Sequence, residues 1–147
     1  MRHHLYNPDF KFVVEPEHFN KYTERELLQY CLGATMYMPG FKDFAPKILN
    51  NSMPGLTTMV MCCEDACPEE RVLEAEENIH KTLDIISSAV EKGKLDADKV
   101  PLIFVRIRSL EQFKHFGEGG KEPLRYQLPE VQRRKRLRVL CVPQGLE

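Results

Sequence analysis

Residues 56–66, LTTMVMCCEDA, decide the fold class of this chain. From Met59 to Cys63, apolar side chains and thiols follow one another without the alternation of a strand that has one face in water. Such a continuous run is typical of a strand that is covered on both faces, as in a parallel sheet. The run ends at two acidic residues, Glu64 and Asp65. We therefore expect a buried parallel strand with two carboxylates at its carboxyl end.

Two further apolar runs flank this strand along the chain. Residues 34–40, ATMYMPG, end at Pro39-Gly40, and residues 100–108, VPLIFVRIR, are rich in β-branched side chains. Each run is short and is closed by turn-forming or charged residues, so each predicts another buried strand.

Arg106 interrupts the last of these runs near its end. A charge in a buried strand is costly unless it is paired, so Arg106 requires a carboxylate or an anionic ligand. Glu64 and Asp65, at the end of the neighbouring strand, are the nearest candidates. Two interpretations stay open: the group binds an anionic ligand, or it is an arginine–carboxylate clamp that only ties two strands together.

A segment with helical character follows each predicted strand. These segments cover residues 41–51, 69–92 and 109–116, and Pro68 suits the first position of the longest one. Its apolar side chains recur at every third or fourth position: Val72, Ala75, Ile79, Leu83, Ile86 and Val90. Strands and helices in alternation, with short connections, predict parallel strands with right-handed crossovers, an α/β fold. In such folds the working residues lie at the carboxyl ends of the strands.

The two ends of the chain depart from this pattern. Residues 1–22 are aromatic and proline-containing without a clean period, which predicts an irregular arm, and a helix over about residues 24–32 follows before Gly33. Residues 125–147 contain the basic run QRRKR, of the kind found in nucleic-acid-binding proteins. We expect a division into residues 1–33 (arm and helix), 34–124 (α/β domain) and 125–147 (basic tail).

Composition narrows the class of protein. The formal net charge is −1, with 42% hydrophobic and 29% charged residues, as in soluble globular proteins. Since the tail is basic, the rest of the chain is mildly acidic, which argues against nucleic acid as a partner. No apolar stretch is long enough to cross a membrane, and the N-terminus lacks the apolar core of a signal peptide. Five cysteines, an odd number, predict free thiols and a cytoplasmic location.

The three strand motifs, MYMPG, MVMCCEDA and FVRIR, resemble in order and spacing those of the HpcH/HpaI aldolase and citrate lyase β-subunit superfamily. Members show strands that end in Pro-Gly, in Leu-Glu-Asp-Ala and in Val-Arg-Ile-Asn. MRHH and LLQYCLGATMYMP are similar to a bacterial citrate-lyase-like subgroup, the carbon–carbon bond lyases of the TIM-barrel fold. The resemblance covers about residues 1–116. Cys63 stands where the motif has Leu, a conservative change for packing, and Arg108 stands where it has Asn, a change that bears on substrate preference.

The resemblance implies the first three βα units of a (β/α)₈ TIM barrel. Its activity would be Mg²⁺-dependent cleavage or formation of a carbon–carbon bond in a small acyl or 2-oxo acid. Arg106, Glu64 and Asp65 would be catalytic: Arg106 would bind a carboxylate or carbonyl oxygen of the substrate, and the two acids would order that arginine and the water shell of the metal. Gly40 would also contact the substrate.

The length of the chain limits this expectation. A TIM barrel takes about 250 residues, and the metal ligands of the family come from later strands, for which this chain has no candidate. We therefore expect a truncated lyase that is inactive as this chain.

A shifted reading frame would explain the sequence of the tail, residues 125–147. The family continues with a strand that contains Pro-Lys, and residues 125–147 lack such a strand. One permitted set of codons for these residues, read one nucleotide later, gives GINFPKFNAEN and then ALEYFASLKDL, a Pro-Lys strand and an amphipathic helix. We therefore expect a frameshift near residue 124.

Two other interpretations stay open. The chain could be a small, complete α/β binding module whose basic tail docks on an acidic partner or a nucleic acid. It could also be part of a barrel that is completed by oligomerisation.

Overall fold

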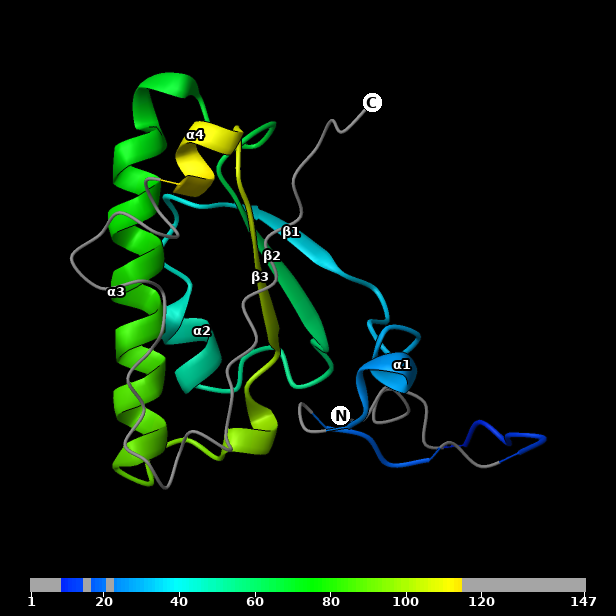
Figure 1. Cartoon of the computed structure of the whole chain (residues 1–147). Helices are drawn as coiled ribbons and strands as arrows, with labels where there is room; N and C mark the ends of the chain where they lie inside the picture. Colours follow the sequence, from blue (N-terminus) through cyan, green and yellow to red (C-terminus); the bar gives the residue numbers. More distant parts are fainter. Residues whose placement is uncertain (1–8, 15–16, 21–22, 115–147) are drawn as a thin grey trace, which may run out of the picture.

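A computed structural model describes residues 9–14, 17–20 and 23–114 of the chain. Within these residues, one parallel sheet contains β1 (Met36–Pro39), β2 (Thr58–Cys62) and β3 (Leu102–Arg106), in that order (Figure 1). Strands that follow one another along the chain are therefore neighbours in the sheet, as in successive βα units of a barrel. The prediction of an α/β fold with three parallel strands is confirmed. The predicted tail, residues 125–147, lies outside the described residues.

The three strands end at the same level. Pro39 of β1 is the partner of Cys62 of β2, and Cys62 is in turn the partner of Arg106 of β3. The loops that follow the strands consequently start at one common edge, which we call the carboxyl edge of the sheet.

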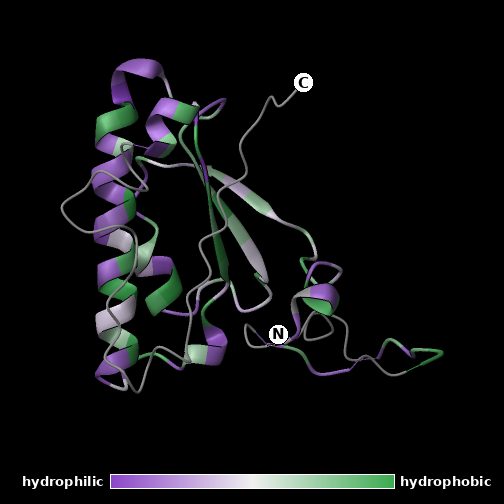
Figure 2. Cartoon of the chain, viewed as in Figure 1, coloured by the Kyte–Doolittle hydropathy of each residue, from purple (hydrophilic) through white to green (hydrophobic). Residues whose placement is uncertain are grey.

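Helices cover one face of this sheet (Figure 1). They are α2 (Ala45–Leu49), α3 (Val72–Glu91) and α4 (Leu110–Gln112), and short 3₁₀ helices, η2 (Glu69–Arg71) and η3 (Ala97–Lys99), precede α3 and β3. Hydrophobic residues recur between hydrophilic ones along α3 (Figure 2), as expected for a helix with apolar side chains at every third or fourth position.

The core lies between the sheet and α3. Its buried side chains come from alternate strand positions and from the stripe of α3: Met38, Met59, Met61, Ile103, Val105, Ala75, Ile79, Leu83 and Ile86. Each fully buried large aliphatic side chain contributes about 1.5–3 kcal/mol to the stability of the fold. This packed layer holds the carboxyl edge in place.

The predicted helices are longer than the observed ones. The first spans only Arg25–Leu28, because Leu28 is buried while Leu27 and Tyr30 are exposed, and short helices gain their stability from packing. α2 begins at Ala45 rather than near residue 41. Pro46 occupies its first turn, and the Ala45 amide donates to Asp43 Oδ1 at 3.1 Å.

The described parts of the predicted N-terminal arm, residues 9–14 and 17–20, contain no helix or strand, as expected for an irregular segment. Among the helices of residues 23–114, none has both the length and the apolar character needed to cross a membrane.

Candidate active site

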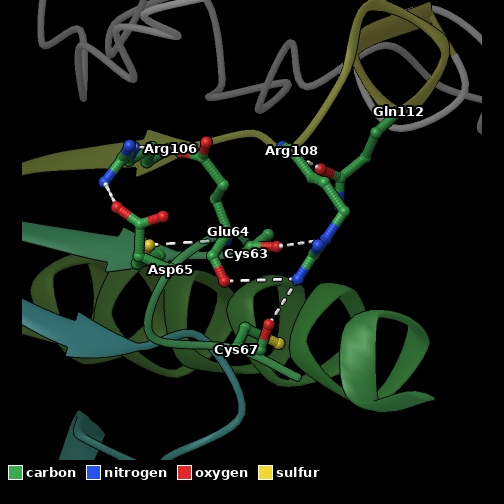
Figure 3. Close-up of polar contacts among 8 residues, drawn as sticks. Cys63, Glu64, Asp65, Cys67, Arg106, Arg108 and Gln112 are labelled. Atoms are coloured by element: carbon green, nitrogen blue, oxygen red, sulfur yellow. Dashed lines mark hydrogen bonds and ion pairs between the residues drawn. The ribbon is translucent and has the colours of Figure 1, made fainter. Parts of the chain in front are cut away.

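Three of the predicted site residues meet at the carboxyl edge. The Arg106 side chain leaves the end of β3, and Glu64 and Asp65 follow β2 (Figure 3). Arg106 Nη1 donates a hydrogen bond to Asp65 Oδ2 at 2.7 Å, and Arg106 Nη2 forms an ion pair with Glu64 Oε2. The expectation that Arg106 pairs with these acids is confirmed. Whether any of the three is catalytic stays a prediction.

The backbone explains why the acids lie there. The sheet continues one residue beyond β2, since the Cys63 amide donates to the Arg106 carbonyl at 2.8 Å. The chain then turns, and the Cys67 amide donates to the Glu64 carbonyl at 2.9 Å. Glu64 and Asp65 therefore stand at the first turn after the strand, beside the end of β3. We call residues 63–67 the acidic loop.

The two carboxylates differ in exposure. The Glu64 side chain is 20% exposed and the Asp65 side chain 73%, while the Arg106 side chain between them is 15% exposed. The Glu64 contact is an ion pair without the alignment of a hydrogen bond, whereas the Asp65 contact is hydrogen-bonded. One guanidinium thus faces two carboxylates, one sheltered and one largely in water.

The pKa of Arg106 reflects this environment. Burial acts to lower the pKa of the guanidinium, but the hydrogen bond to Asp65 and the charges of both carboxylates outweigh it, and the pKa is raised. Arg106 is therefore a permanent cation at this edge.

Gly40 lies at the same edge but under α3. Its amide donates to the Cys62 carbonyl at 2.8 Å, and its carbonyl accepts from Asn78 Nδ2 at 2.6 Å. A β-carbon at position 40 would lie 3.1 Å from Ala75 Cβ and 3.2 Å from Ile79 Cδ1. These contacts account for a glycine at this position through the close approach of α3. A contact between Gly40 and a substrate stays a prediction.

Arg108 and Gln112 are part of the edge, and the sequence analysis assigned neither to the site. Arg108 Nε donates to the Cys63 carbonyl and Nη2 to the Glu64 carbonyl, each at 3.2 Å, and Nη2 also donates to the Cys67 carbonyl. The Arg108 amide donates to Gln112 Oε1 at 2.6 Å. A capping pattern, Ser-x-x-Gln at residues 109–112, is the signal that could have pointed to Gln112.

The thiols of the acidic loop are buried and unreactive. Burial raises the pKa of Cys63 to about 12, with the neighbouring Cys67 as the second cause. Burial also raises the pKa of Cys67. Because a thiolate is the nucleophilic form, neither thiol is a candidate nucleophile at neutral pH. The described cysteines are all free.

The carboxyl edge does not fit a magnesium ion by itself. Its two carboxylates are both engaged by Arg106. Among the described residues, no group of three or more His, Cys, Asp or Glu side chains is placed to hold a metal ion. Mg²⁺ prefers several oxygen ligands in octahedral geometry, and this edge does not assemble them.

Comparison with known proteins adds the family. A family model described as carbon–carbon bond lyase of the TIM-barrel fold matches residues 26–131. The match includes all three described strands together with Glu64, Asp65 and Arg106. No curated protein and no solved structure matches the chain. Because the family match spans well over half of the sequence, the chain belongs to the carbon–carbon bond lyases of the TIM-barrel fold.

Proposed function

We propose that the carboxyl edge is the anion-binding part of a lyase site for a small acyl or 2-oxo acid. The observation that carries this proposal is the position of Arg106, a cation at the carboxyl end of a parallel strand, between two carboxylates of different exposure. Active sites of (β/α)₈ enzymes lie at this end of the strands.

Arginine suits the chemistry of such a substrate. Its planar guanidinium can bind a carboxylate, or a carboxylate and the adjacent carbonyl oxygen of a 2-oxo acid, through parallel hydrogen bonds. Negative charge grows on the carbonyl oxygen when a neighbouring carbon–carbon bond breaks, and a fixed cation stabilises that charge. Arg106 therefore binds and orients the substrate.

Asp65 is the group that the substrate replaces. A third anion next to Arg106 would be repelled by both carboxylates, so one of them must leave. Asp65 is already mostly in water and loses little when it turns outward, whereas Glu64 is sheltered and stays paired. The substrate carboxylate then takes the place of Asp65 at Arg106 Nη1.

We infer that the three strands bind substrate without completing the reaction. Catalytic residues of (β/α)₈ enzymes come from several strand ends. Mg²⁺ would polarise an enolate oxygen in this chemistry, but the described residues do not assemble its ligands.

The test is a titration of the full chain with pyruvate and oxaloacetate, followed by calorimetry. We expect saturable binding, weakened about tenfold or more by Arg106→Gln, since a charge-assisted pair is lost, and less by Arg106→Lys. The matched control is Arg71→Gln: Arg71 forms a comparable two-point pair with Glu74 and contacts neither acid of the loop. Equal binding by wild type and Arg106→Gln would refute the proposal and leave a purely structural clamp.

We also propose that the reading frame changes near residue 124. What supports this is that residues 125–147 lack the Pro-Lys strand of the family, while a neighbouring frame supplies one; the family match itself runs on to residue 131 and marks no boundary at residue 124. Sequencing of the genomic DNA on both sides of the Leu124 codon tests this. A downstream frame without further barrel strands would refute it.

A further inference from the structure

Arg108 turns back over the acidic loop instead of pointing away from it (Figure 3). Within the described part of the chain, its side-chain hydrogen bonds go to backbone carbonyls of that loop, those of Cys63, Glu64 and Cys67. We propose that Arg108 is a positioning residue that fixes the acidic loop, and through it the two carboxylates that hold Arg106. This inference rests on the proposed function of Arg106 as the substrate-binding group.

The loop needs a cation at this point. Three carbonyl oxygens converge on the Arg108 guanidinium, and the negative ends of their dipoles repel one another unless a positive group lies between them. The Glu64 carbonyl accepts a second hydrogen bond, from the Cys67 amide, so the turn and the arginine share one acceptor. The forked guanidinium reaches all three oxygens, which a single ammonium group does less well.

Arg108 is itself anchored to α3. Its amide donates to Gln112 Oε1, and Gln112 Nε2 donates to Glu76 Oε1 at 2.8 Å. Gln112 and Glu76 are both buried, and the Gln112 amide is capped by Ser109 Oγ at 3.1 Å. A continuous set of hydrogen bonds therefore runs from the longest helix, through Gln112 and Arg108, to the loop beside Arg106.

The two arginines consequently have different tasks. The Arg106 guanidinium faces side-chain carboxylates, one of which can be replaced by a substrate. Arg108 donates through Nε and Nη2 to carbonyls that belong to the fold, so we assign it the task of holding the loop. Loss of Arg108 should loosen the acidic loop, and the loosened loop should in turn weaken substrate binding at Arg106.

Hydrogen exchange and thiol labelling of the full chain test this directly. The Cys67 amide is hydrogen-bonded and its thiol is buried, so both report opening of the loop. In Arg108→Ala we expect both to react about tenfold or more faster than in wild type, because hydrogen bonds to a charged group are lost. Arg108→Lys should give a smaller increase. Arg71→Ala is the control for amide exchange alone, because Arg71 acts electrostatically on the Cys67 thiol, and it should leave that exchange unchanged.

Addition of guanidinium ion, far below denaturing concentrations, separates the clamp from a general loss of packing. It should restore protection of the Cys67 amide in Arg108→Ala and leave wild type unchanged. A loop that stays protected in Arg108→Ala, or one that opens without any rescue by guanidinium, would overturn the proposal. If Arg108→Ala does not fold, the same comparison between wild type and Arg108→Lys decides, and equal protection in these two proteins would overturn it.

Titration of the same variants with pyruvate separates this inference from the proposed function. We expect Arg108→Ala to bind more weakly than wild type, and guanidinium ion to restore part of the affinity. Unchanged affinity together with an open loop would overturn the positioning role. If wild type itself does not bind the oxo acids, the proposed function fails, while the exchange of the Cys67 amide still decides whether Arg108 holds the loop.

Discussion

Arg106 and Arg108 are two residues apart, yet they occupy opposite kinds of environment. Arg106 pairs with side chains, one sheltered and one exposed, whereas Arg108 donates to backbone carbonyls and is tied through Gln112 to a buried glutamate. A side-chain partner in water can be exchanged for a ligand at little cost, but a backbone partner can be lost only if the loop itself moves. The same side-chain type thus serves an exchangeable contact and a fixed one.

Cys63 lies between the two arginines, and its titration should disturb both. Its amide donates to the Arg106 carbonyl, and its carbonyl accepts from Arg108. Folding raises the pKa of the thiol from 9.0 to about 12. The unfolded state releases this proton at a lower pH than the folded state does. The contribution to the free energy of unfolding is therefore fully present below pH 9.0 and is lost as pH rises towards 12, by about 1.4 kcal/mol for each pH unit.

Urea unfolding between pH 8 and 11 measures this alkaline loss. We expect a smaller slope in Cys63→Ala, which has no thiol to titrate at this position, than in wild type. Identical slopes in the two proteins would show that Cys63 does not titrate differently in the folded state.

Gln112→Leu tests the hydrogen bonds that tie Arg108 to α3. The substitution removes the hydrogen bond to the buried Glu76 carboxylate and the acceptor of the Arg108 amide. We expect the free energy of unfolding to fall by about 2–3 kcal/mol, measured from the urea midpoint. Gln29→Leu, which removes an exposed hydrogen bond to the Glu26 carbonyl, should cost less than about 0.5 kcal/mol. Equal costs for the two variants would refute the importance of the buried network.

Glu64→Gln tests the sheltered partner of Arg106. The carboxylate is mostly shielded from water, so loss of its charge should lower the free energy of unfolding by about 1 kcal/mol. It should also weaken binding of pyruvate, because Arg106 loses the partner that holds it in place. Thermal unfolding and calorimetry measure the two effects. A variant as stable as wild type would mean that Glu64 is as replaceable as Asp65.

Asp65→Asn tests the exchangeable partner and should have the smallest effect on stability. Because Asp65 is largely exposed, we expect a change within about 0.5 kcal/mol, and added salt should reduce it further. Affinity for pyruvate should rise, since a competing anion is removed from Arg106 Nη1. Weaker binding in this variant would show that Asp65 assists the substrate rather than competing with it.

The sequence predicted the contacts of Arg106 far better than those of Arg108. A charged residue in a continuous apolar run requires a partner, and the level ends of parallel strands place Glu64 and Asp65 beside Arg106. The contacts of Arg108 depend instead on how residues 63–67 turn and on where their carbonyls point, which no side-chain pattern encodes. The helix predicted over about residues 24–32 is present but was predicted too long for a similar reason, because its length depends on packing, and Tyr30 has little contact to gain.

Gly40 and Ala75 carry a consequence for how this family varies. A β-carbon at position 40 would lie 3.1 Å from that of Ala75 and 3.2 Å from both the Cys62 carbonyl oxygen and Ile79 Cδ1, so it would crowd the neighbouring strand as well as α3. A change at either site is then tolerated or not according to the residue at the other, which is the physical basis of epistasis. Among homologous sequences, alanine at position 40 should therefore be rare, and where it occurs position 75 should chiefly be glycine, although the two positions are far apart along the chain.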